Sequence, residues 1–299
     1  MKLASILIND SMDRQTRTVI VDPEQMLCWP IENASVVSAI SDLTKGCTPK
    51  IDPQRGVGFK REQLLAPLST PPHNIMCVGK NYRAHAREFH RSGFDATADS
   101  DIPAEPIIFT KPSSSISGPY ADIPLWPGID ESVDYEAELA IIIGRGGRMI
   151  SRESAMDHVF GYTIVNDVTA RDLQRKHKQW FLGKAIDGFC PMGPWIVSKD
   201  EINLDATRVT CRVNGELRQN AITADLIFDV ATLIEKISIS VTLAPGDVIS
   251  TGTPEGVGIG FDPPRFLKDG DVVECAIEGI GSIVNRVRQI KKTEKQANA

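Results

Sequence analysis

The chain has 299 residues, of which 41% are hydrophobic and 24% are charged, a balance typical of a globular protein and not of a disordered or fibrous one. Its formal net charge is −6, and no stripe of lysine and arginine stands out, so a nucleic-acid-binding protein is disfavoured. The sequence has no run of 18 apolar residues, which argues against a membrane-spanning helix, and its short apolar start predicts a first β-strand rather than a signal peptide.

The six cysteines do not form a metal-binding or disulfide pattern. They are scattered, without a Cys-x-x-Cys spacing, whereas zinc sites cluster their ligands and disulfide scaffolds are short secreted chains. We therefore expect free thiols in the reducing cytoplasm. The cysteines are Cys28, Cys47, Cys77, Cys190, Cys211 and Cys275.

Residues 1–70 are predicted to form a small N-terminal α/β domain. The segments MKLASILI and TRTVIVD have the composition of strands, and VVSAISDLT has the pattern of a short helix. Prolines at positions 67, 71 and 72 then indicate an extended linker, because proline disfavours helix at the residue before it. A second, larger domain is expected over residues 71–299.

The larger domain is predicted to be β-rich, in an α+β arrangement. Short strand-like runs recur along it: IIFT, ELAIIIG, GYTIVND, RVTCRVNG, DVIST, VVECAIEG and GSIVNRV. Asn214-Gly215 is a strong hairpin signal. Helices are expected over residues 151–160, where Ser151 could cap the first turn, and over residues 226–238. The polar stretch 91–106 predicts either a plain surface loop or a lid.

An acidic pattern in the segment around residues 132–144 is the most informative feature of the sequence. Side chains alternate across a strand, so Asp134, Glu136 and Glu138 are expected on one face. Like charges at the edge of a core are unfavourable unless something neutralises them, and a hard divalent cation does so through carboxylate ligands. The alternative is a half-exposed strand with solvated acids.

Asp167 ends a second apolar strand, residues 160–167. An acid at the end of a buried strand favours a functional role, although Asp167 could instead cap a following helix. Three carboxylates from two strands, with water at the remaining positions, suit an octahedral Mg²⁺ site. No histidine is next to these acids in the sequence, which disfavours zinc.

His85 and Glu88 are three positions apart and would be neighbours on a helix. A carboxylate beside a histidine orients the ring and raises its basicity, so the pair could deprotonate water. The alternative is an ordinary pair on the surface of an amphipathic helix.

Two lysines and a glycine-rich segment are further candidates for contacts with an anionic substrate. Lys111 and Lys184 each follow a short apolar run and could meet the charge of a substrate or of an enolate, or could simply be exposed. The segment 251–260 lacks the Gly-Lys-Ser/Thr of a phosphate-binding loop. Its backbone amides could bind a carboxylate ligand, or it could be an ordinary turn.

Seven motifs follow one another along the chain: GKNYRAH, FTKPSSS, DYEAELA, GYTIVNDVTARDLQ, FLGKAIDGFCPMGP, VNGELRQ and TGTPEGVG. In this order they resemble the motifs of the fumarylacetoacetate hydrolase family, over about residues 74–289. The stretches DHVFGYTIVNDVTARDLQ, HKQWFLGK and GFDPPRFL further resemble a bacterial subgroup that carries an extra N-terminal domain and decarboxylates oxaloacetate.

The resemblance implies a rolled mixed β-sheet that forms a barrel, in a homodimer. It implies Mg²⁺ or Mn²⁺ held by Glu136, Glu138 and Asp167, without the additional upstream carboxylate ligand of the founding hydrolases. It implies that His85 and Glu88 activate water, on a segment that orders as a lid. It further implies that Lys184 faces the substrate and that Thr253 binds the carboxylate of the substrate. Gln174 and Lys111 match two further site positions.

The expected substrate is a small 2-oxo acid that chelates the metal. The first expectation is hydrolysis of a C–C bond in an acylpyruvate, with pyruvate enolate as the leaving group. The alternative is decarboxylation of oxaloacetate, or tautomerisation or hydration of a related acid, at the same site. A regulatory binding protein on an enzyme scaffold is disfavoured, because the sequence contains the whole set of candidate site residues.

Overall fold

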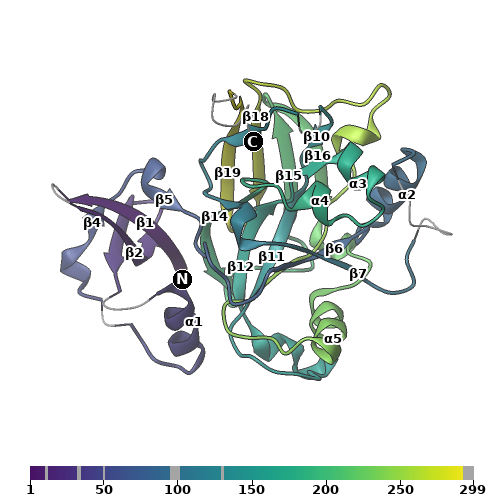
Figure 1. Cartoon of the computed structure of the whole chain (residues 1–299). Coiled ribbons are helices and arrows are strands. Elements are labelled where there is room, and N and C mark those ends of the chain that lie inside the picture. Colours follow the sequence, from purple (N-terminus) through teal and green to yellow (C-terminus); the bar gives the residue numbers. More distant parts are fainter. Residues whose placement is uncertain (11–12, 32–34, 50, 95–101, 129–130, 292–299) are drawn as a thin grey trace, which may run out of the picture.

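The smaller of two lobes contains the first strands of the chain and lies at the left of Figure 1. The computed structural model describes residues 1–10, 13–31, 35–49, 51–94, 102–128 and 131–291. The helix predicted from VVSAISDLT is present as α1. The elements of this lobe are β1 (Lys2–Asp10), β2 (Asp13–Asp22), β3 (Leu27–Pro30), α1 (Val36–Thr44), β4 (Val57–Gly58) and β5 (Leu64–Leu65).

The larger lobe contains the remaining strands, with helices at its margins (Figure 1). Its helices are α2 (Arg83–Arg91), α3 (Arg171–Lys176), α4 (Phe181–Lys184) and α5 (Val230–Ser240). Its strands are β6 (Ile75–Gly79), β7 (Ile107–Lys111), β8 (Ile116–Ser117), β9 (Ile123–Leu125), β10 (Val133–Asp134), β11 (Ala137–Ile143), β12 (Val159–Asn166), β13 (Thr169–Ala170), β14 (Cys190–Ser198), β15 (Arg208–Val213), β16 (Glu216–Ile222), β17 (Val248–Ser250), β18 (Val272–Ile277) and β19 (Gly281–Gln289).

Two sheets contain most of these strands. The first has 12 strands and runs in the order β4-β3-β2-β1-β14-β12-β11-β17-β6-β7, with β5 on β1 and β8 on β14. The second has five strands in the order β16-β15-β18-β19-β9. Most neighbours are antiparallel, but β17 and β6, β14 and β8, and β19 and β9 are parallel. The prediction of mixed sheets is therefore confirmed.

The larger sheet is open, and the pairings among the described residues do not close it into the expected barrel. The reason lies at β14, which pairs with β12 and also with β1, where Lys2 and Leu3 lie opposite Val197 and Ile196. Because β1 occupies this edge, the sheet continues outward into the smaller lobe. The division at residue 70 stays a prediction, since one sheet extends across both lobes.

The strands β11 and β12 are covered on both faces. Leu139 and Ile141 of β11 belong to the core between the two sheets, together with Val209 of β15 and Cys275 of β18. Ala140, on the opposite face of β11, belongs to a second core that also contains residues of α1. Strands that are covered on both faces read as continuous apolar runs, which explains the sequence of β11. Side chains at the ends of these strands are therefore withdrawn from water.

Two predicted helices differ from the observed elements. Residues Arg152–His158 form a 3₁₀-helix, and Ser151 provides no side-chain cap for it. The helix expected from residue 226 begins only at Val230, because the Asp229 carboxylate accepts a hydrogen bond from the Thr232 N–H at 2.9 Å and caps it there. The predicted hairpin is present, with Asn214 and Gly215 at φ 53° and 81°.

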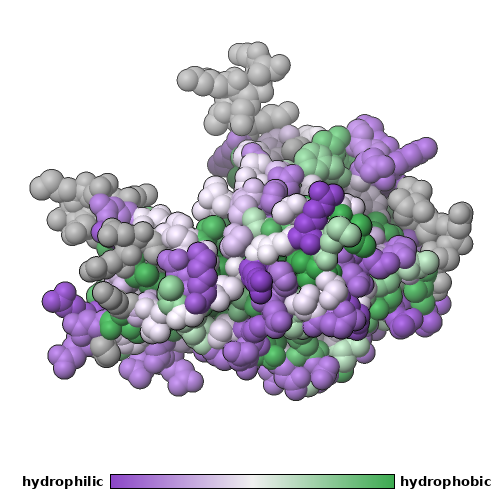
Figure 2. Space-filling view, turned by 90° about the horizontal axis from the view of Figure 1, so that it is seen from below, coloured by the Kyte–Doolittle hydropathy of each residue, from purple (hydrophilic) through white to green (hydrophobic). Residues whose placement is uncertain are grey.

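No helix in the described ranges is both long and apolar enough to cross a bilayer. On the face seen from below, hydrophobic residues lie in small groups among hydrophilic ones (Figure 2).

Candidate metal centre and active site

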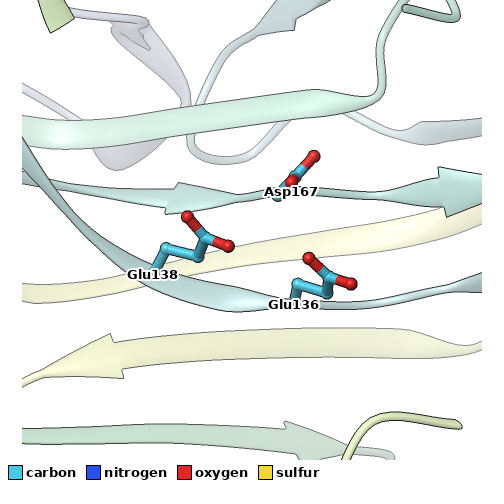
Figure 3. Close-up of side chains that lie close together, drawn as sticks. All are labelled: Glu136, Glu138 and Asp167. Carbon is cyan, nitrogen blue, oxygen red and sulfur yellow. The ribbon is translucent and has the colours of Figure 1, made fainter. Parts of the chain in front are cut away.

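Three carboxylates converge where the two central strands meet. Glu136 directly precedes β11, Glu138 is its second residue, and Asp167 directly follows β12. The strands are antiparallel, with Ala137 opposite Asn166, so the start of one lies beside the end of the other. One carboxylate oxygen from each of the three side chains lies within 4.8 Å of the other two (Figure 3).

The surroundings of Glu138 fit a bound cation. Glu138 Oε2 accepts hydrogen bonds from two neutral donors, the Ser250 hydroxyl at 2.6 Å and the Gly252 N–H at 3.0 Å. Burial raises the pKa of Glu138 well above its usual range, and the charges of Asp167 and Glu136 raise it further. A hard divalent cation relieves this repulsion, because its preferred ligands are carboxylate oxygens. The buried acidic triad therefore fits such an ion.

Lys184, on α4, bridges the other two carboxylates. Its Nζ lies 2.8 Å from Glu136 Oε2 and 2.6 Å from Asp167 Oδ2. Burial acts to lower the pKa of Lys184, but Asp167 and Glu136 outweigh it, so the pKa is raised and the ammonium stays charged. Burial likewise acts to raise the pKa of Glu136, but Lys184 and then Arg171 lower it to about 2. Lys184 therefore favours the ionised form of Glu136.

Lys111 forms a buried ion pair with Asp167 of the triad. It is fully buried at the end of β7, with its Nζ 2.7 Å from Asp167 Oδ1 and 3.0 Å from the carbonyl oxygen of Val168. It is not among the residues that line the cavity described below. The structure thus places Lys111 against a candidate metal ligand, whereas the sequence predicted a contact with the substrate.

Asp134, the remaining acid of the alternating pattern, pairs with an arginine. The strand is interrupted between β10 and β11, and Asp134 Oδ2 lies 2.9 Å from both Nε and Nη2 of Arg171. Arg171 Nη2 also lies 2.7 Å from Glu136 Oε1. Asp134 therefore belongs to a buried ion-pair network beside the metal triad. Sequence reasoning missed Arg171; its only signal was a charged residue four positions after Asp167.

The predicted acid–base pair is present on α2. His85 Nδ1 lies 3.1 Å from Glu88 Oε2, and Glu88 Oε1 accepts a hydrogen bond from the Gly256 N–H at 2.9 Å. The His85 ring is almost completely buried. Since Nδ1 is engaged with Glu88, Nε2 is the ring nitrogen that can exchange a proton with a substrate.

The glycine-rich loop binds carboxylates of the protein itself. In addition to the bonds from Gly252 to Glu138 and from Gly256 to Glu88, the N–H groups of Gly258 and Ile259 donate to Asp134 at 2.6 and 3.2 Å. Gly252 and Gly256 have φ values of 99° and 97°, which favour glycine. The expectation of an anion-binding loop holds for these four amides, which bind carboxylates of the protein; binding of a ligand's carboxylate by this loop stays a prediction.

The hydroxyl of Thr253 is engaged on both sides. It donates to the carbonyl oxygen of Ala137 at 3.1 Å and accepts from Gln219 Nε2 at 2.7 Å. Gln219, fully buried on β16, also accepts from the Ala137 N–H at 3.0 Å. Sequence reasoning assigned Gln219 no role, although it ends the VNGELRQ motif. The Thr253 hydroxyl can therefore donate to a substrate only if its hydrogen turns away from the Ala137 carbonyl oxygen.

A cavity joins the metal triad to the acid–base pair. Phe89, Phe109 and Trp180 form an aromatic wall, with ring centroids 5.9 Å apart for Phe89 and Trp180 and 5.3 Å apart for Phe109 and Trp180. Gln174 Oε1 accepts from Arg171 Nη1 at 3.2 Å, so its NH₂ group can donate to a ligand. The lining consists of Val78, Gly79, Lys80, His85, Phe89, Phe109, Glu136, Glu138, Arg171, Gln174, Trp180, Lys184 and Thr253.

The structure tests the predicted lid only in part. The helix α2 ends at Arg91, and residues 95–101 of the predicted lid segment 91–106 lie outside the described residues. The acid–base pair itself lies on α2, next to this segment.

Most of the chain is similar to a known protein family and to named relatives in it. Residues 74–288 match the family model described as fumarylacetoacetate (FAA) hydrolase C-terminal. The oxaloacetate tautomerase YisK of Bacillus subtilis is 48% identical over 226 residues, which are 75% of this chain and 73% of that protein. The mitochondrial oxaloacetate tautomerase FAHD2A of Homo sapiens is 47% identical over 227 residues, 75% of this chain and 69% of that protein.

Solved structures extend the similarity to almost the whole chain. The fumarylacetoacetate hydrolase of Exiguobacterium antarcticum matches with a TM-score of 0.83 and 40% identity, covering 97% of this chain and 100% of that one. The 5-carboxymethyl-2-hydroxymuconate delta-isomerase of Mycobacterium smegmatis matches with a TM-score of 0.76 and 34% identity, covering 98% and 100%. With its motifs, its acidic triad and these relatives, the chain belongs to the fumarylacetoacetate hydrolase family.

Proposed function

We propose that this protein is a Mg²⁺- or Mn²⁺-dependent tautomerase that interconverts the enol and keto forms of oxaloacetate. The observation that carries the proposal is a single cavity lined by the buried histidine of the His85–Glu88 pair, by two carboxylates of the acidic triad and by a charged lysine. The relatives named as oxaloacetate tautomerases support the choice of substrate.

Glu136, Glu138 and Asp167 are the residues that would hold the metal. An all-carboxylate donor set suits Mg²⁺ and Mn²⁺ and disfavours zinc. When bound, the ion supplies a Lewis acid for the carboxylate and 2-oxo oxygens of the substrate. Lys111, Lys184 and Arg171 keep the ligands in place through their ion pairs.

The chain's own groups then move one proton. In the direction from ketone to enol, the C3–H bond breaks, His85 Nε2 accepts the proton, and the C2–O bond becomes single as its oxygen takes a proton from solvent. Glu88 stabilises the imidazolium and is itself held by the Gly256 N–H. The Lys184 ammonium lowers the energy of the negative charge that develops on the 2-oxo oxygen. The reverse direction returns the proton to C3.

Hydrolysis of an acylpyruvate is the second candidate function, favoured by the same His85–Glu88 pair. If the pair accepts the proton of a water molecule instead of the proton at C3, the hydroxide formed can attack the distal carbonyl of such a substrate. Decarboxylation of oxaloacetate needs the developing charge to be stabilised but needs no attacking water. The sequence placed hydrolysis first, whereas the relatives favour the tautomerase alternative.

The test follows three reactions side by side with Mg²⁺ or Mn²⁺, with and without chelator. Ultraviolet absorbance reports the decay of enol-oxaloacetate to the ketone, a coupled assay reports pyruvate release, and acetylpyruvate consumption reports hydrolysis. We expect the highest kcat/KM for tautomerisation, and its loss in His85→Gln but not in His90→Gln, an exposed histidine on the same helix. Faster turnover of acetylpyruvate than of enol-oxaloacetate would reject the proposal in favour of a hydrolase.

A further inference from the structure

Gln219 is a buried polar side chain that the chemistry above does not use. It belongs to β16 of the second sheet and is fully buried. Its Oε1 accepts from the Ala137 N–H at 3.0 Å, and its Nε2 donates to the Thr253 hydroxyl at 2.7 Å. Nε2 also donates to the carbonyl oxygen of Pro254 at 2.8 Å. Because Ala137 lies between the two glutamates of the triad and Thr253 lines the cavity, one amide links the candidate metal ligands to a residue that faces the ligand.

An irregularity of β16 lies directly beside Gln219. Gln219 lies opposite Cys211 of β15, but the next residue of β15 lies opposite Leu217, so Arg218 is an extra residue in β16. Such bulges change the direction of side chains and are frequent next to active sites. The glycine-rich loop packs against this bulge, because an added Cβ at Gly256 would overlap the carbonyl oxygen of Arg218. The side chain of Gln219 therefore lies where β16 and the loop are in close contact.

The neighbours of Gln219 fix the orientation of its amide. A backbone N–H can only donate and a carbonyl oxygen can only accept, so Oε1 must face Ala137 and Nε2 must face Pro254. The two hydrogens of Nε2 are then both used, one on the Pro254 carbonyl oxygen and the other on the Thr253 hydroxyl oxygen. The Thr253 hydroxyl therefore accepts from Gln219 and must direct its own hydrogen to another acceptor.

We infer that Gln219 is a positioning residue, which keeps the Thr253 hydroxyl in the role of donor to a carboxylate of the substrate. The inference rests on the proposed function, in which the cavity binds a small 2-oxo acid. Without a ligand, the Thr253 hydrogen is directed at the Ala137 carbonyl oxygen, at 3.1 Å. A carboxylate accepts but does not donate, and hydrogen bonds to an ionised group are stronger than neutral ones, so an arriving carboxylate draws this hydrogen.

The donor from Gln219 excludes the unproductive orientation of the hydroxyl. If an acceptor stood in the place of Nε2, the Thr253 hydrogen would point toward β16, and only lone pairs would face the carboxylate of the substrate. Gln219 thus acts on the substrate through Thr253, without touching the substrate itself, since it is not among the residues that line the cavity.

The test is a double-mutant cycle with Thr253, measured by binding so that it does not depend on turnover. Malate has the carboxylates of oxaloacetate but no oxo group to tautomerise, and calorimetric titration of the Mg²⁺-loaded full chain measures its affinity. Thr253→Val should lower this affinity about 10- to 100-fold, as expected for a lost hydrogen bond to a charged group. Gln219→Met should lower it by less, about 3- to 10-fold, because the hydroxyl remains but is no longer oriented. Added to Thr253→Val, Gln219→Met should change it less than about twofold.

Three further measurements separate positioning from damage to the fold. In the enol-decay assay, Gln219→Met should raise KM more than it lowers kcat, because the bond to the carboxylate is made in the ground state and in the transition state alike. Asn220→Met changes an exposed neighbour in the same strand and should bind malate like the wild type. If Gln219→Met does not fold, Gln219→Glu replaces it in the cycle, since one oxygen still accepts from Ala137 while the other draws the Thr253 hydrogen.

The outcomes distinguish this inference from the proposed function. Failure of the wild type to bind malate, an unchanged affinity in the Gln219 variant, or the same loss with and without the Thr253 hydroxyl would overturn the inference. The last of these results is what a general disturbance of β16 produces. A coupled loss in a protein that does not accelerate the decay of enol-oxaloacetate would instead overturn the proposed function and leave the role of Gln219 standing.

Discussion

The acidic triad and the histidine of the site belong to regions of the molecule that differ in construction. The triad lies at the ends of β11 and β12, which are buried on both faces, and three cations and two neutral donors surround it. His85 and Glu88 lie on α2, nine residues long, which is joined to the rest of the site through Gly256 and through the packing of Phe89 on Trp180. Metal binding and proton transfer should therefore be separable by mutation.

The largest effect is expected from Glu138→Ala. Removal of this carboxylate leaves two of three ligands, so binding of Mg²⁺ and Mn²⁺ in calorimetry should be lost and turnover should fall roughly 1000-fold or more. Glu278→Ala, which removes an exposed glutamate from the turn between β18 and β19, is the matched control. Metal-supported activity that survives in Glu138→Ala would rule out the assigned triad.

His85→Gln should separate the two regions. The loss of the proton acceptor is expected to lower kcat about 100- to 1000-fold, while the metal affinity stays within about twofold of the wild type, because no metal ligand is altered. Calorimetry for the metal and the enol-decay assay measure the two quantities on the same preparation. A parallel loss of both would show that α2 and the triad act as one unit.

Gly260→Ala tests how the glutamate is held. A Cβ at residue 260 would lie 1.8 Å from Glu88 Oε1, so the Glu88 side chain must move away from His85. We expect kcat to fall about 10-fold, less than on loss of the histidine itself, with unchanged metal affinity. Gly58→Ala is the control, since a Cβ there meets no atom within 4 Å. Wild-type kcat in Gly260→Ala would show that the position of Glu88 is unimportant.

The smallest effect concerns pH and the metal-free protein. The pKa of Glu138 is raised in the folded state above its ordinary value of 4.5. Above pH 4.5 the folded state therefore binds more protons than the unfolded state, and the contribution of Glu138 to the free energy of unfolding falls as the pH rises. Glu138→Gln removes this titration. Without metal, the Tm of the variant relative to the wild type should therefore increase from pH 5 to pH 8, by about 4 °C. A constant Tm difference would contradict the raised pKa.

The triad could be predicted from sequence because it depends on simple geometry. Alternation along a strand and acids at strand ends are local patterns, and they located Glu136, Glu138 and Asp167. The same alternation grouped Asp134 with Glu136 and Glu138 but did not predict the break at residues 135 and 136, which separate β10 from β11. A break of this kind depends on distant partners, here Arg171 and the amides of Gly258 and Ile259.

The other differences between the predictions and the structure also come from contacts between residues that are far apart in the sequence. The composition of the loop 251–260 predicted backbone amides that bind an anion, but no local pattern indicates that the anions are Glu88, Asp134 and Glu138. Lys111 could not be distinguished from a substrate-facing lysine without knowing that β7 points it at Asp167. The open sheet depends on β1 reaching β14, a pairing of strands that are far apart in the sequence.

The pairing of β1 with β14 has a consequence for the order of folding. Lys2 lies opposite Val197, so β1 is synthesised long before the strand that it will extend. Contacts of such high sequence separation form slowly, because the intervening chain must be ordered first. Until β14 is available, the edge of β1 that β14 will cover presents free N–H and C=O groups. If β1 is displaced later, the edge of β14 exposes its own backbone groups in the same way. A fusion or truncation that disturbs the first few residues should therefore reduce the yield of soluble protein rather than the activity of the molecules that do fold.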